Sequence, residues 1–470
     1  MRVRAGVPNA LPVSDSTTAT AGGNTQTSPR LTRTSHKLKR ACLCLPFVSR
    51  GSSSSSTSTS LQTQRTTFAM NPIASSSTAP PRGTSSSSDP ASVTIKTRIL
   101  IISDTHGVRP TETAPPEPET LSSPCTLYGH TSSRSPFHLP LPAADVVIHC
   151  GDLTKRSSVE EYRSTISVLR QIQAPVKIAI AGNHDLSLHQ QFIKENIDDV
   201  NKSQPSLVWL ARQVAMHAEA RNVLTENKDI TYLEEGTQEI VLLNGAKLRL
   251  YTSPWTPSYG GWAFQYEGSH NFSIPQGIDV AVTHGPPLGM QDYAASGDYA
   301  GCPMLFNSIQ KARPRIHCFG HIHEAWGGYY GHWAFPEGTS WQQAVGTGDP
   351  GASAAPDTSS YYGNNSDSDA SMTPPPPQTL DALDPERSYV IENVNSIRLS
   401  RGDSEEEASR KREKYARYSS QGCCHVDVSP EGQIPVERGK QTLFLNAAIL
   451  DRRYKIAHFP WLVEIDLPRA

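Results

Sequence analysis

Five short polar motifs constrain this chain more than any other feature of its sequence, because each directly follows a short apolar run. The motifs are Ser103–Gly107 (SDTHG), Gly151–Asp152 (GD), Gly182–Asp185 (GNHD), Thr283–Gly285 (THG) and Gly320–His323 (GHIH). Short apolar runs bounded by turn residues predict buried strands. In an open α/β sheet, the loops at the carboxyl ends of the strands converge on one edge. We therefore predict that residues as far apart as Asp104 and His323 meet at one site.

The apolar pattern predicts an α/β fold. Strands are expected at Arg98–Ser103, Asp145–Cys150, Val176–Ala181, Gln238–Leu243, Lys247–Tyr251, Ile278–Thr283, Arg315–Phe319, Gln441–Asn446 and Trp461–Leu467. Ser158 and Glu161 form a capping-box pattern, which predicts a helix that starts after Ser158. A second helix is expected at Ser206–Leu224. Asn244 and Gly245 predict a hairpin turn.

Composition divides the chain into four regions. Residues 1–92 are rich in Ser and Thr, and they predict a disordered basic tail. Residues 93–346 are expected to form the folded domain, with a Pro-rich loop insertion at 108–142. Residues 347–440 are predicted to be a mostly disordered insertion in which Glu405–Arg417 forms a solvated helix. Residues 441–470 are expected to return two strands to the domain.

Charge and cysteine content narrow the setting of the protein. The formal net charge of −2 gives no pull toward duplex nucleic acid. No apolar run is long enough to predict a membrane span. The eight cysteines do not form a disulfide framework, which favours a reducing compartment and a cytoplasmic location. The basic, acid-poor start leaves mitochondrial import open, and Met70 is an alternative translation start.

The residue types in the motifs suit metal ions. Carboxylate, amide and imidazole groups are ligands for Mn, Fe, Zn or Ni, and thiolates are absent from the motifs. The candidate ligands are Asp104, His106, Asp152, Asn183, His284, His321 and His323. Seven ligands exceed the needs of one six-coordinate ion, but they suit two ions if one carboxylate bridges them. Each residue alone has an ordinary structural explanation; their occurrence together, each after a predicted strand, favours the metal site.

At these motifs the sequence resembles the calcineurin-like metallophosphoesterases, whose signature is D-x-H, GD, GNH, H and GHxH. The segments SPWTPSYGGWAF and VTHGPPLGMQD also resemble the metallophosphoesterase-domain-containing group, which is similar to class III cyclic nucleotide phosphodiesterases. The resemblance implies a four-layer αββα sandwich with the metals at the carboxyl ends of the strands.

The resemblance also implies a role for each motif residue. Asp104, His106 and His323 would hold one ion; Asn183, His284 and His321 would hold the other; Asp152 would bridge them. His184 would protonate the leaving oxygen, with Asp185 orienting the ring of His184. The implied cofactors are two divalent transition-metal ions, with Mn²⁺ expected first and Fe, Zn or Ni as alternatives.

The implied function is hydrolysis of a phosphodiester or phosphomonoester bond in a small or nucleotide-like substrate, by a hydroxide that bridges the ions. A Ser/Thr-type protein phosphatase is an alternative, but the comparison with the motif GDxxDRG at Gly151-Asp152 implies that the phosphate-clamping arginine is missing, which disfavours this alternative. A non-catalytic interaction scaffold is another alternative, but none of the ligand positions is lost. Protein partners are not predicted.

Two sets of residues stay open or structural. Trp255, Trp262 and Phe264 are expected either to line a base-sized pocket by stacking or to belong to the core. His149, His270 and His317 are expected to be structural residues that need only a hydrogen-bond partner.

Overall fold

Two mixed sheets carry all of the motif loops. The computed structural model describes residues 93–111, 135–201, 207–334 and 382–470. The predictions for residues 1–92, for the middle of the 108–142 insertion and for residues 347–381 lie outside these ranges.

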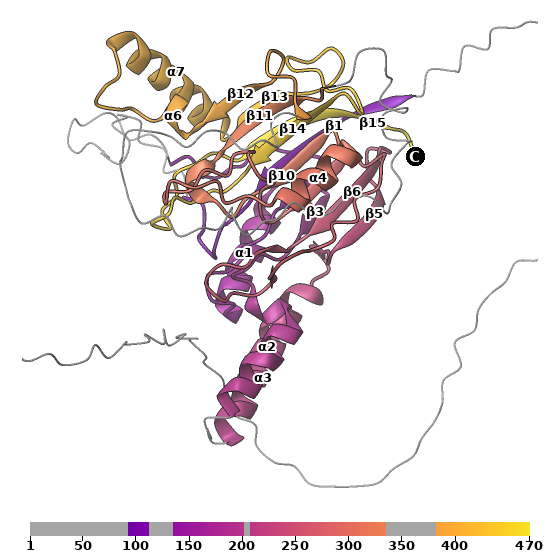
Figure 1. The fold of residues 1–470 in the computed structure, drawn as a ribbon, viewed down its shortest axis with the longest axis vertical. Coiled ribbons are helices and arrows are strands. Elements are labelled where there is room, and N and C mark those ends of the chain that lie inside the picture. The colour runs from indigo at the N-terminus through magenta and orange to yellow at the C-terminus, as the bar shows by residue number, and fades with distance from the viewer. Residues whose placement is uncertain (1–92, 112–134, 202–206, 335–381) are drawn as a thin grey trace, which may run out of the picture. The chain divides into compact units, whose positions relative to one another are not determined.

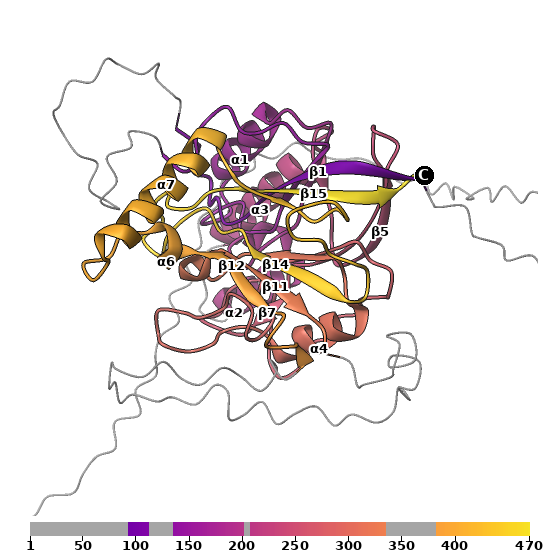
Figure 2. The ribbon, with the colours of Figure 1, turned by 90° about the horizontal axis from the view of Figure 1, so that it is seen from above.

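The first sheet has the strand order β13-β15-β1-β2-β3-β4. Figure 1 labels β13, β15, β1 and β3 of this sheet. Its strands are β13 (Cys424–Asp427), β15 (Trp461–Pro468), β1 (Thr94–Ile102), β2 (Val146–His149), β3 (Val176–Ala179) and β4 (Thr231–Tyr232). Strands β1 to β4 run parallel to one another, so their carboxyl ends lie along one edge. Strand β15 is antiparallel to β1, and Figure 2 shows the two side by side.

The second sheet has the order β12-β11-β14-β10-β9-β6-β5. Its strands are β12 (Tyr389–Asn393), β11 (Gly327–His332), β14 (Gln441–Asn446), β10 (Ile316–Phe319), β9 (Val280–Thr283), β6 (Lys247–Ser253) and β5 (Gly236–Val241). The four strands β6, β9, β10 and β14 are parallel. Strands β5 and β6 form an antiparallel hairpin around Asn244-Gly245, as predicted. A separate ribbon pairs β7 (Thr256–Pro257) with β8 (Gln265–Tyr266).

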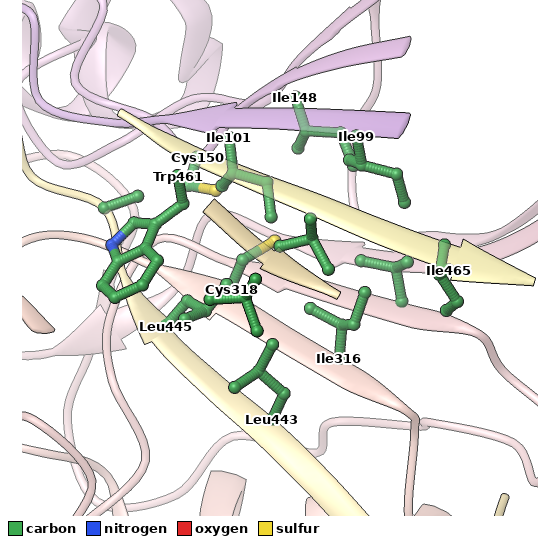
Figure 3. Close-up of a cluster of buried hydrophobic side chains, with 14 of the residues drawn as sticks. Ile99, Ile101, Ile148, Cys150, Ile316, Cys318, Leu443, Leu445, Trp461 and Ile465 are labelled. Carbon is green, nitrogen blue, oxygen red and sulfur yellow. The ribbon is translucent and has the colours of Figure 1, made fainter. Parts of the chain in front are cut away.

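Alternation along the strands separates the layers. In β1, Ile99 and Ile101 point between the sheets, whereas Leu100 and Ile102 point to the outer face. Figure 3 shows the inner cluster, in which side chains of both sheets interdigitate. The outer face of the first sheet packs on helix α1, and the outer face of the second packs on helix α4. The layers are therefore helix, sheet, sheet and helix, which confirms the predicted αββα sandwich.

Helix α1 begins where the sequence predicts a cap. Helix α1 (Val159–Gln171) has a complete capping box from Ser158 and Glu161. Helices α2 (Gln190–Asn201) and α3 (Leu207–Thr225) follow the third motif, and α4 (Pro303–Ala312) follows β9. Two short 3₁₀ turns, η1 (Leu186–Leu188) and η2 (His323–Ala325), lie next to motifs. None of the helices in the described ranges is long and apolar enough to cross a membrane.

The prediction of a mostly disordered segment at 347–440 is wrong for its second half. Residues 382–440 contain β12, β13, a short helix α6 (Val394–Ile397) and the helix α7 (Glu405–Gln421). Helix α7 is not merely solvated, because Tyr415 and Tyr418 are buried and place their rings 5.2 and 5.7 Å from the ring of Phe459. Two tyrosines three positions apart form one helix face, a signal that the surrounding charged residues obscure.

Candidate metal centre

The motif loops of the two sheets meet at one place. Asp104 and His106 follow β1, Asp152 follows β2, and Asn183 follows β3. On the facing sheet His284 follows β9, and His321 and His323 follow β10. Backbone hydrogen bonds join the loops directly: the N–H of Asp104 donates to the carbonyl of Gly151, and the N–H of Gly320 donates to the carbonyl of His284.

Asp104, His106 and His323 form one compact group that could hold an ion. The Nε2 atom of His323 lies 3.3 Å from Asp104 Oδ1 and 3.3 Å from the Nε2 atom of His106. The Nδ1 atoms of these rings contact the backbone carbonyls of Asp451 and Thr154, at 3.0 and 2.9 Å. A carbonyl only accepts, so each Nδ1 carries a proton, and the Nε2 atoms of both rings point into the group.

A second group surrounds His284. Its Nδ1 donates to the carbonyl of Cys150, and its Nε2 lies 2.9 Å from Asn183 Oδ1 and 3.4 Å from Asp152 Oδ1. The other carboxylate oxygen of Asp152 lies 3.5 Å from His106 Nε2. Asp152 therefore lies near histidines of both groups, and Asp104 also forms a compact group with Asp152 and His284.

His321 completes the set from the facing sheet. Its ring lies 5.0 Å from the ring of His284, at an interplanar angle of 65°. Its backbone N–H donates to the Asp104 carboxylate at 3.0 Å. All seven predicted ligands are thus brought together, although the ligand roles themselves stay predictions.

The donor set fits divalent cations. Two Nε2 atoms lie 3.3 Å apart beside buried carboxylates, and imidazole nitrogens with carboxylate oxygens are ligands of divalent transition metals. Donation of Nδ1–H to a backbone carbonyl is also the usual second contact of a metal-binding histidine. The backbone is strained at four of the predicted ligands, which all have positive φ: Asp104, His106, Asp152 and His321. Strain of this kind is typical of functional sites.

Two glycines make the close approach possible. A Cβ at Gly320 would collide with the carboxylate of Asp104, and a Cβ at Gly182 would collide with that of Asp152. The glycines of GHIH and GNHD therefore leave room for the carboxylates beside them.

Burial and charge set the protonation of the ligands. Burial lowers the pKa of His106 and of His321 to about 3, so both rings are neutral, which is the form that binds metal. Burial opposes ionisation of Asp104, but the hydrogen bond and charge of His323 outweigh it and hold the pKa of this carboxyl below its ordinary value. Asp152 behaves in the same way: burial is outweighed by His284 and His184, and its pKa is lowered.

The predicted role of Asp185 in orienting His184 is wrong. The Nδ1 atom of His184 contacts the carbonyl of Lys155 at 3.0 Å. The Asp185 carboxylate instead accepts from the N–H groups of Leu153, Thr154 and Gly182, at 3.1, 2.9 and 2.9 Å, and from the Thr154 hydroxyl at 2.7 Å. Asp185 thus ties the second motif loop to the third.

The comparison with GDxxDRG also needs a correction. The arginine of that motif falls on Arg156, and the replaced residues are its neighbours, which are Lys155 and Ser157 here. Arg156 is exposed, and its backbone N–H donates to Glu161 at 3.0 Å. The argument from this motif against a protein phosphatase is therefore weaker than the sequence pattern indicated.

His184 lies at the rim of the centre among residues that the motifs did not reveal. Its ring is 4.9 Å from that of His106 and stacks on Trp262 at 4.1 Å. Tyr454 places its ring 4.9 Å from His106, and the ammonium of Lys155 lies 3.7 Å from the centre of the Tyr454 ring. Lys155 directly follows the GD motif loop, whereas Tyr454 comes from the far end of the chain and has no sequence signal.

The three aromatic residues left open by the sequence have different positions. Phe264 is buried in the core and stacks on His189 at 4.6 Å. Trp255 is half-buried and packs against two hydrophobic clusters. Trp262 alone of the three contacts the ring of His184. Core packing therefore accounts for Phe264 and Trp255, and a place at the metal centre for Trp262.

Comparison with known proteins agrees with this geometry. The family model of calcineurin-like phosphoesterases matches residues 97–325, which include every predicted ligand. Residues 97–325 are a calcineurin-like phosphoesterase domain. The domain also resembles the metallophosphoesterase-domain-containing proteins, as the sequence predicted.

The relatives of this calcineurin-like phosphoesterase domain match only part of this chain, and the match covers only part of their own length. Metallophosphoesterase domain-containing protein 1 of Homo sapiens is 34% identical over 196 residues, which are 40% of this chain and 57% of that protein. UPF0046 protein T07D4.2 of Caenorhabditis elegans is 31% identical over 199 residues, 40% of this chain and 48% of that protein. The matched region thus spans about half the length of these relatives. Among solved structures, TT1561 of Thermus thermophilus matches at 12% identity with a TM-score of 0.25, over 48% of this chain and 82% of that one.

Proposed function

We propose that this protein hydrolyses phosphoester bonds of a small or nucleotide-like substrate with the help of two divalent metal ions, Mn²⁺ first among them. The observation that carries the proposal is the convergence of His106 and His323, whose Nε2 atoms lie 3.3 Å apart, on the buried carboxylate of Asp104. The division of the ligands around Asp152 favours two ions rather than one.

When bound, two such ions would lower the pKa of a water molecule and offset the charge of the phosphate oxygens. The chain itself supplies the geometry. Asp104, His106 and His323 would hold one ion; Asn183, His284 and His321 would hold the other; Asp152 would contact both.

We propose His184 as the general acid. Its Nδ1–H is engaged by the carbonyl of Lys155, which leaves Nε2 as the nitrogen that can carry a proton to the leaving oxygen. Trp262 covers the face of the ring and limits its rotation. Lys155 and Tyr454 stand beside it, where the rest of the substrate would approach.

Purified protein, stripped of metal with a chelator, should be assayed with bis-p-nitrophenyl phosphate and p-nitrophenyl phosphate, with and without added Mn²⁺. We expect turnover of at least one substrate only when Mn²⁺ is present. Tight Mn²⁺ binding without turnover of either substrate, or of 2′,3′- and 3′,5′-cyclic nucleotides, would instead support the scaffold alternative.

A further inference from the structure

Two tripeptides occur twice in the chain, and the structure pairs them. The sequence THG stands at 105–107 and 283–285, and IHC stands at 148–150 and 316–318. The first THG lies beyond β1, whose parallel neighbour β2 carries the first IHC. The second THG begins at the end of β9, whose parallel neighbour β10 carries the second IHC. Each sheet thus brings one IHC histidine beside one THG threonine.

In the second sheet this pairing closes a short hydrogen-bond chain. His317 Nε2 lies 2.9 Å from Thr283 Oγ1, and Thr283 Oγ1 donates to the carbonyl of Gly285 at 2.7 Å. The Thr283 hydroxyl has a single proton, which it donates to the Gly285 carbonyl. The hydroxyl must therefore accept from His317, so Nε2 of His317 carries a proton. These two hydrogen bonds therefore hold Thr283 and Gly285, the residues on either side of His284.

The first sheet repeats the contact. His149 Nε2 lies 2.9 Å from Thr105 Oγ1, and Thr105 separates the candidate ligands Asp104 and His106. Both of these neighbours have left-handed backbone conformations, with φ of 53° and 46°. A side-chain contact at Thr105 thus holds a strained segment in place.

Neither histidine is explained by core packing. His149 and His317 are 0% exposed, and the Nδ1 atom of each has no hydrogen-bond partner among the residues that the structure describes. An unpaired buried nitrogen costs free energy that an aliphatic side chain at the same strand position would avoid. Burial lowers the pKa of His149 to about 4 and of His317 to about 3, so the rings act as neutral hydrogen-bonding groups.

We propose that His149 and His317 are positioning residues that hold the metal-ligand loops through Thr105 and Thr283 and so set the affinity for metal. The inference rests on the proposed function, because it requires that the centre binds metal. If the two histidines were only structural, their replacement would change stability alone. A positioning role predicts that a folded variant also binds metal more weakly.

The test is titration of metal-free protein with Mn²⁺ by calorimetry, on wild type, His317→Leu, His317→Gln and Thr283→Val. Loss of an outer contact of this kind typically weakens metal binding about 10- to 100-fold. We expect that loss for both His317→Leu and Thr283→Val. Thr283→Val removes the hydroxyl and keeps the histidine ring, so it provides the test if His317→Leu does not fold. His317→Gln keeps an N–H donor, and we expect it to bind Mn²⁺ within a few-fold of wild type.

His217 offers a matched control. It is also a buried histidine beside a hydroxyl group, with Nδ1 2.7 Å from Ser187 Oγ, and its Nε2 has no hydrogen-bond partner within the described ranges. Unlike His149 and His317, it does not contact a residue next to a predicted ligand. His217→Leu should lower stability without changing Mn²⁺ affinity. Wild-type affinity in His317→Leu or in Thr283→Val, or an equal loss in His217→Leu, would overturn the inference alone. A wild-type protein that binds no Mn²⁺ would overturn the proposed function as well.

Discussion

Replacing Asp185 with Ala should destabilise the fold more than any other single change to a charged residue of the motif loops. The Asp185 carboxylate is 0% exposed and accepts hydrogen bonds from three backbone N–H groups and one hydroxyl. The Thr154 hydroxyl can turn toward the carbonyl of His184, 3.4 Å away, but the three N–H groups cannot move. At about 1–3 kcal/mol for each unsatisfied buried donor, with some relief from entering water, we expect a loss of about 3–6 kcal/mol.

The assay is urea unfolding of the metal-free protein, monitored by tryptophan fluorescence. The free energy of unfolding is extrapolated to zero urea. Asp145→Ala is the control, because its carboxylate accepts one hydrogen bond, from the N–H of Arg98 at 2.7 Å, and should cost only about 1 kcal/mol. If Asp185→Ala lowers the free energy of unfolding no more than Asp145→Ala does, Asp185 does not hold the second and third motif loops together.

Three further changes address the centre directly. Asp152→Asn should lower turnover at least about 100-fold and reduce the Mn²⁺ content, and wild-type turnover with both ions bound would refute its bridging position. His184→Gln should slow substrates with poor leaving groups about 10²- to 10⁴-fold, yet slow p-nitrophenyl esters much less, because nitrophenolate leaves without a proton. Gly320→Ala should weaken Mn²⁺ binding, because its Cβ would displace the carboxylate of Asp104. Gly402→Ala should leave Mn²⁺ affinity unchanged, because its Cβ would meet no atom of the described residues within 4 Å; equal affinities in the two variants would contradict this steric argument.

The sequence predicted the elements of the site because local patterns determine them. The apolar runs before each motif became β1, β2, β3, β9 and β10, and the capping box at Ser158 formed as expected. The convergence of the loops also followed, since parallel strands end at a common edge.

Contacts between distant segments could not be predicted in the same way. The carbonyl of Asp451 fixes the tautomer of His323, and Tyr454 covers His106, but no spacing in the sequence points from one segment to the other. The resemblance implied that Asp185 orients the ring of His184, whereas the turn directs its carboxylate toward the loop that follows β2. The repeated THG and IHC tripeptides were visible in the sequence, but only the strand pairing gives them a meaning.

The most direct test of the central claim is the number of Mn²⁺ ions that the metal-free protein binds, measured by calorimetry with turnover of bis-p-nitrophenyl phosphate and p-nitrophenyl phosphate followed in the same samples. The arrangement of seven ligands around Asp152 predicts two ions per chain, with turnover of at least one substrate appearing as the sites fill. Binding of one ion or none, or turnover that persists in the chelator, would contradict it.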